Sequence, residues 1–188
     1  LLVGFVLWLA YGISIANGIV VSAPTGAAYF YNGSFTGAYA ISKYNGTSVA
    51  QAAAVSGYSD ATAISPGDIF ALAYSGYSGI SSATGITVVA SAGDAYLYSG
   101  NSIGAYAFSG DFGLSQATGA YVDAQYDATA VTYGYVSAGA YAGDTSQAVA
   151  FGIGVHSANG YAALYSYGPI SAYAYAGDYS LALAQAAS

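Results

Sequence analysis

AYAFSGDF, at residues 105–112, contains an Ala-Tyr-Ala unit followed by Gly-Asp, and this combination recurs twice further along the chain. It returns as AYAGD at 140–144 and as AYAYAGDY at 172–179. The Gly-Asp pairs begin at Gly110, Gly143 and Gly177, so they are 33 and 34 residues apart. A fixed spacing of this size is typical of the coils of a β-solenoid. The residues between the motifs do not align, so the pattern favours recurrent turn chemistry in a β-sandwich over a solenoid.

Short apolar runs alternate with Gly, Asn and Asp along the rest of the chain, a pattern typical of an all-β protein. Asn-Gly pairs at Asn32 and Asn45 supply the positive φ angles that tight hairpin turns need. We expect a helical turn at 51–55 and strands at 27–31, 37–42, 69–74, 85–90, 95–98, 103–108, 130–136, 148–155, 162–167 and 171–175. These strands predict an all-β jelly-roll or Ig-like β-sandwich.

The composition excludes several classes of protein. Charged residues make up 5% of the 188-residue chain, whereas about 25% is usual in soluble domains. One Lys and no Arg cannot neutralise a phosphate backbone, so nucleic acid is not an expected partner. The chain has no Cys, which excludes disulfides and thiolate metal sites. Its 26 Gly and 22 Tyr are typical of a secreted structural material that associates with itself.

The most apolar segment is VGFVLWLAYGISI, at residues 3–15. It lacks the basic region that precedes a signal sequence, so it is interpreted as the start of a mature protein. Large side chains occupy alternate positions, and this period of two indicates a β-strand. The bulky face of that strand comprises Val3, Phe5, Leu7, Leu9, Tyr11, Ile13 and Ile15.

Three interpretations of this segment remain open: a first strand of the chain's own sheet, an apolar helix in a filament core or membrane, and a strand donated to a neighbouring subunit. The third is favoured, because burying seven large side chains in a neighbour would hold subunits together strongly. The break Ala23-Pro24-Thr25-Gly26 resembles a hinge. The predicted organisation is therefore a donor tail at 1–22 and a β-sandwich head at 23–188.

The sequence contains few of the residue types that catalytic sites use. His156 and Lys43 are each the sole residue of their type, and no G-x-S-x-G motif occurs. The Gly-Asp pairs do not form a D-x-D-x-D-G calcium loop. We expect neither an enzyme nor a metal or cofactor site, and His156 is interpreted as an exposed or hydrogen-bonded residue at a strand end. Two sequons, Asn32-Gly33-Ser34 and Asn45-Gly46-Thr47, predict N-linked glycans on surface turns.

An apolar N-terminal strand, a hinge and an uncharged β-rich body with sequons resemble the subunits of archaeal extracellular filaments, the threads and bundling pili, which assemble by donor-strand exchange. ISPGD at 64–68, followed by IFALAY, is similar to the Leu-x-Pro-Gly-Asp turn of the related TasA-type fibre proteins of bacteria. The lack of charge departs from the bacterial members.

The resemblance implies an extracellular, cell-surface homopolymer in which each N-terminal strand fills a groove in the next subunit, without stable membrane insertion after assembly. Two alternatives remain: an archaeal type IV pilin with an N-terminal core helix, and a cell-surface carbohydrate-binding or adhesin domain. The last is suggested by Tyr side chains that could stack on sugars.

Overall fold

The computed structural model describes residues 3–9 and 12–188, and it is a parallel β-solenoid of about five turns. Every strand pair in the described residues is parallel. The predicted jelly-roll or Ig-like sandwich is therefore wrong, because sandwiches are built from antiparallel strands joined by short turns. The all-β class itself is confirmed.

Three parallel sheets run along the solenoid. Each of the first five coils contributes one strand to each sheet, and the last, partial coil contributes a strand to sheets A and B. Sheet A contains, in spatial order, β1 (Val3–Leu9), β4 (Thr36–Ser42), β7 (Ile69–Ser75), β10 (Ile103–Phe108), β13 (Val136–Tyr141) and β16 (Ile170–Tyr175). Sheet B contains β2 (Ile13–Ala23), β5 (Thr47–Gly57), β8 (Ile80–Ala90), β11 (Leu114–Ala124), β14 (Gln147–Ser157) and β17 (Leu181–Ala187). Sheet C contains β3 (Ala28–Tyr31), β6 (Ala61–Ser65), β9 (Ala95–Ser99), β12 (Ala128–Thr132) and β15 (Ala162–Ser166).

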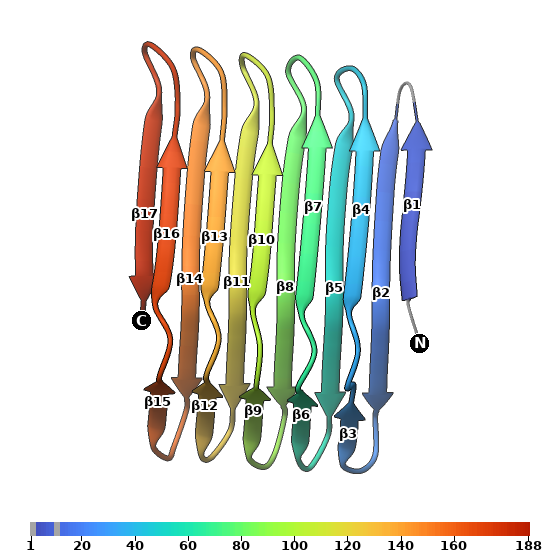
Figure 1. The fold of residues 1–188 in the computed structure, drawn as a ribbon, viewed down its shortest axis with the longest axis vertical. Coiled ribbons are helices and arrows are strands. Elements are labelled where there is room, and N and C mark those ends of the chain that lie inside the picture. The colour runs from blue at the N-terminus through green and yellow to red at the C-terminus, as the bar shows by residue number, and fades with distance from the viewer. Residues whose placement is uncertain (1–2, 10–11) are drawn as a thin grey trace.

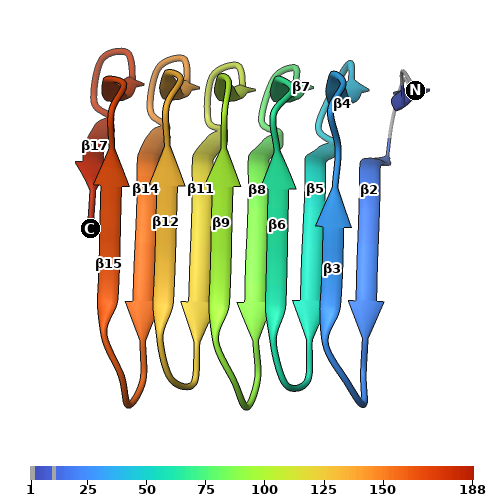
Figure 2. The same ribbon diagram turned by 60° about the horizontal axis from the view of Figure 1, so that its bottom comes forward.

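The coil is flattened into two layers. Strands of sheets C and A follow one another in the same direction along one side, and the longer strands of sheet B return along the other (Figure 1). Figure 2 shows the strands of sheet C lying over those of sheet B and running in the opposite direction. Strands β1 and β2 lie at one end of the stack, and strands β16 and β17 lie at the other (Figure 1).

The spacing of the Gly-Asp motifs is the length of one coil. In sheet A, Ile69 pairs with Ile103, 34 residues on, and Ile103 pairs with Val136 after another 33. The turns thus connect sheets of one coil and are not hairpins, so the hairpin interpretation of the Asn-Gly pairs is wrong. The expected helical turn at 51–55 is also wrong, because these residues lie within β5.

Alanine dominates the core because the two layers pack closely. Sheet A presents inward columns such as Ala71, Ala105 and Ala138, which are fully buried and stacked in register. Buried serines occupy the corner between sheets A and B, where Ser81 Oγ lies 2.8 Å from Ser75 Oγ and donates to the Phe108 carbonyl at 2.5 Å. No buried side-chain N or O atom in the described residues lacks a hydrogen-bond partner, as a stable interior requires.

Many tyrosines form ladders on the outer surface. Phe108 and Tyr141 stack between neighbouring coils with ring centroids 4.9 Å apart, and Tyr133 and Tyr167 stack at 4.6 Å. Parallel in-register strands lie about 4.8 Å apart, so identical outward positions bring aromatic rings into contact. The high Tyr content therefore has a structural role, because such pairs contribute beyond the apolar area that they bury.

Candidate functional site

The two ends of the solenoid expose unpaired strand edges. At the C-terminal end, β16 and β17 pair on one side only, and at the N-terminal end the same holds for β1 and β2. The Leu181 N–H donates to the Ser146 carbonyl at 3.1 Å. Because peptide groups alternate in direction along a strand, the N–H groups of Ala182 and Ala184 point towards the open edge. Such an edge is a template for pairing with a further strand.

The opposite edge has complementary groups. Thr47 N–H donates to the Gly12 carbonyl at 3.0 Å, so the peptide groups of Ile13 and Ile15 point away from β5 towards the open edge. Their side chains lie on the outer face of sheet B and are 64% and 52% exposed. These two members of the predicted donor face are therefore not buried within the chain.

The predicted donor strand is part of the chain's own first coil. Val3, Phe5, Leu7 and Leu9 lie in β1, whose backbone pairs with β4 over Val3–Leu9 and Thr36–Ser42. Tyr11 lies outside the described residues. Gly12, with φ of +114°, precedes β2, so the segment is two strands in two sheets. A single extended strand over 3–15 is therefore wrong, because the segment divides into β1 and β2, and each of them pairs on one side within the parent chain.

Aspartate ladders fasten successive coils together at two turns. Asp144 N–H donates to Asp111 Oδ1 at 3.0 Å, and Asp178 N–H donates to Asp144 Oδ1 at 2.9 Å. A second ladder links Asp94 N–H to Asp60 Oδ1 at 3.1 Å and continues at Asp127. Each carboxylate thus accepts a backbone N–H from the next coil. The turn interpretation of the Gly-Asp pairs fits this geometry, and the described residues contain no cluster of metal-ligating side chains.

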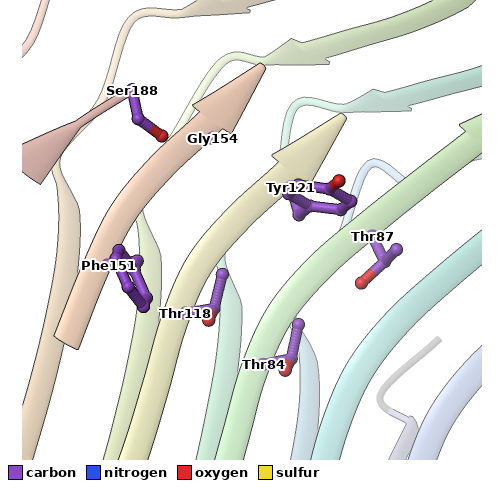
Figure 3. A pocket seen from close by; sticks show the side chains of 7 residues that line it. All are labelled: Thr84, Thr87, Thr118, Tyr121, Phe151, Gly154 and Ser188. Atoms are coloured by element: carbon purple, nitrogen blue, oxygen red, sulfur yellow. The ribbon is translucent and has the colours of Figure 1, made fainter. Parts of the chain in front are cut away.

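A groove runs across the coils on the outer face of sheet B. Within β8, β11 and β14 two consecutive residues face inward, such as Gly119 and Ala120, so a strip of backbone carries no outward side chain. Thr84, Thr118 and Phe151 line one side of this strip, and Thr87, Tyr121 and Ser188 line the other (Figure 3). The hollow has a volume of about 390 Å³, within the range of small-ligand sites.

Gly154 deepens the groove beside Tyr121. A Cβ at this position would lie 3.1 Å from Tyr121 Cδ2 and 3.5 Å from Ser188 Oγ, and its three nearest atoms all belong to side chains. Burial, and then the negative charge of Asp123, raise the pKa of Tyr121 above its ordinary value of 10.0. The phenol is therefore neutral at physiological pH and keeps its hydroxyl donor.

His156 lies just beyond this groove and has a partner that the sequence did not indicate. Its Nδ1 is 2.8 Å from Asp123 Oδ1, and the two residues are register partners on β14 and β11. The sequence signal for this contact is the separation of Asp123 and His156, which are one coil length apart. The imidazole side chain is 63% exposed, and exposed ion pairs contribute little to stability. This geometry confirms the interpretation of His156 as a hydrogen-bonded surface residue.

The two sequons differ in accessibility. Asn45 is exposed in the turn between β4 and β5. Asn32 is half-buried, and its Nδ2 donates to the Ser34 carbonyl and to Thr36 Oγ1. Glycosylation needs a free carboxamide nitrogen, so the structure favours Asn45 and disfavours Asn32.

When the chain passes through a glycosylating secretory pathway, we expect a glycan at Asn45 and none at Asn32. Intact-mass measurement and peptide mapping would show one modified sequon, and the N45Q variant would return to the unmodified mass. A glycan on Asn32 would contradict the prediction, because its hydrogen bonds to the turn would have to break.

Comparison with known proteins finds no matching family model, no matching curated protein and no matching solved structure. Across residues 3–9 and 12–188, no helix has the length and apolarity needed to span a bilayer.

Proposed function

We propose that this chain is a structural subunit of an extracellular filament in which identical copies stack end to end. Strands β1 and β2 of one copy would pair with β16 and β17 of the next, extending sheets A and B. The observation that carries the proposal is the match between the two ends: each exposes unpaired strands of the same two sheets with outward-pointing peptide groups. Such a heterologous contact does not close, so it produces a fibre.

Side-chain size supports this junction. One inward column of sheet B reads Ile19, Ala53, Ile86, Ala120, Ile153 and Ala187, so large and small residues alternate from coil to coil. A second copy would place Ile19 directly after Ala187 and continue the alternation. Interleaved large and small side chains fill space between layers without voids.

The aspartate ladder at the turns also supports the end-to-end junction. Asp178 ends the ladder that begins at Asp111, and within the described residues no donor contacts its carboxylate. A further coil stacked on this end would cover that carboxylate, as the following coil covers each preceding carboxylate of the ladder. Charged residues make up only 5% of the chain, so few like charges would oppose the stacking of subunits that each carry a formal net charge of −7.

This end-to-end stacking differs from the donor-strand assembly expected from the sequence, in which the N-terminal strand of one subunit fills a groove in the next. Sheets A and B have six strands each and sheet C has five, so stacking would continue the first two sheets and leave one position in sheet C without a strand at each junction. The pilin alternative is less favoured, since the described residues of the segment expected to form its core helix lie in strands β1 and β2.

Electron microscopy and fibre diffraction of the purified 188-residue chain test the proposal. Six strands spaced about 4.8 Å apart in each of sheets A and B predict a subunit repeat near 29 Å and a strong axial reflection at about 4.8 Å. Sedimentation should show growth with concentration. A chain that remains monomeric at every concentration, or a filament whose strands lie parallel to its axis, would overturn it.

A further inference from the structure

The groove on sheet B is built by the repeat and extends over β8, β11 and β14 to Ser188, beside the C-terminal end of the solenoid. Its floor is backbone, because Gly85, Gly119 and Gly152 and the residues that follow them all face inward. Side chains on either side rise from neighbouring coils, so the groove lies along the solenoid axis (Figure 3). A long, narrow ligand that crosses several coils fits this shape.

The lining is neutral and combines aromatic rings with hydroxyl groups. Tyr121 and Phe151 provide apolar ring faces and edges, and Thr84, Thr87 and Thr118 provide hydroxyls. Gln51, the register partner of Thr84, donates from Nε2 to the Thr87 hydroxyl at 3.2 Å, so its side chain crosses the backbone strip and closes the groove on the side of the earlier coils. No charged side chain lines the hollow, so neither phosphate nor a carboxylate ligand would find a counter-charge.

We propose that this groove binds a neutral polysaccharide chain lying along the solenoid axis. Sugar rings present apolar faces that stack on aromatic side chains and hydroxyls that exchange hydrogen bonds with Thr and Tyr. Tyr121 acts as a hydroxyl donor and a ring platform, and Gly154, which lines the hollow beside it, adds no side chain to the path of the ligand. The proposal goes beyond filament formation and applies to a single subunit as well as to an assembled fibre.

Calorimetric titration of the chain with hexasaccharides tests the proposal. The panel contains neutral β-1,4-glucan, β-1,4-mannan, β-1,4-linked N-acetylglucosamine and α-1,4-glucan oligomers, with oligogalacturonate as the charged comparison. We expect saturable binding of at least one neutral oligomer and none of the charged one. Losses of about tenfold or more in affinity are expected for Tyr121→Ala and Phe151→Ala, because buried aromatic anchors dominate binding energy.

Gly154→Val is the most specific variant, because it fills the groove and removes no binding group. Its affinity should also fall at least about tenfold, since an occupied pocket excludes the ligand. Tyr165→Ala, on the outer face of sheet C, is the matched control and should bind as the unaltered chain does. Circular dichroism confirms that each variant is folded. Absence of binding across the panel, preference for oligogalacturonate, or unchanged affinity in the three groove variants would overturn the proposal.

Discussion

Replacing Ala182 and Ala184 with proline is expected to leave each subunit folded and to abolish filament growth. Both residues lie in β17, and their N–H groups point away from β14 towards the open edge. Proline removes those donors without breaking a hydrogen bond inside the subunit, and it is tolerated in edge strands. Electron microscopy should show no fibres, and sedimentation should show a monomer with the circular dichroism of the parent chain.

The matched control places serine at the same two positions. Serine keeps both N–H groups and remains small enough for the inward side of the coil, so Ala182→Ser with Ala184→Ser should assemble normally. If the proline variant formed fibres with the parent's yield and repeat, pairing at β17 would not drive assembly. The end-to-end model would then be wrong even if the chain is a filament subunit by another route.

The period of the fold is clearest in the sequence at a spacing of two coils. DATAIS at 60–65 and DATAVT at 127–132 are 67 residues apart, as are the LYS triplets at 97–99 and 164–166. Sixty-seven residues are two coils, one of 33 and one of 34. Adjacent coils differ because large residues alternate with small ones, so a comparison at one coil length finds Leu97 opposite Ala130 and hides the repeat.

Other features could not be obtained from a single pass along the chain. Alternation at 3–15 correctly indicates strands, but it does not reveal the change of sheet around Gly12, where φ is +114°. The groove arises where two consecutive residues of a strand face inward. This breaks the alternation of inward and outward residues, so the strands are harder to recognise in the sequence. The Asp123–His156 contact needs the coil register before the two residues can be recognised as neighbours.

The glycine column at the bend of sheet B shows how tightly the core constrains sequence. Gly119 lies in β11 where the strand bends, and an added Cβ would meet the Gly152 carbonyl oxygen at 2.5 Å and Val136 Cγ1 at 2.7 Å. The first contact is with backbone held in the next coil, so it cannot be relieved by a rotamer change. The same column contains Ala52 and Ala186, which means that one methyl is accommodated in some coils, and a larger side chain makes the sharper test.

Gly119→Val is therefore expected to destabilise the fold by about 3 kcal/mol, at the upper end of overpacking penalties. For a chain of this length that corresponds to a fall in Tm of roughly 6–12 °C, measured by thermal denaturation followed by circular dichroism. Gln116→Val, an outward position on the same strand, is the control and should change stability by no more than about 0.5 kcal/mol. Equal melting temperatures for the two variants would mean that the bend can open, and a bend that opens could not maintain the backbone floor on which the groove depends.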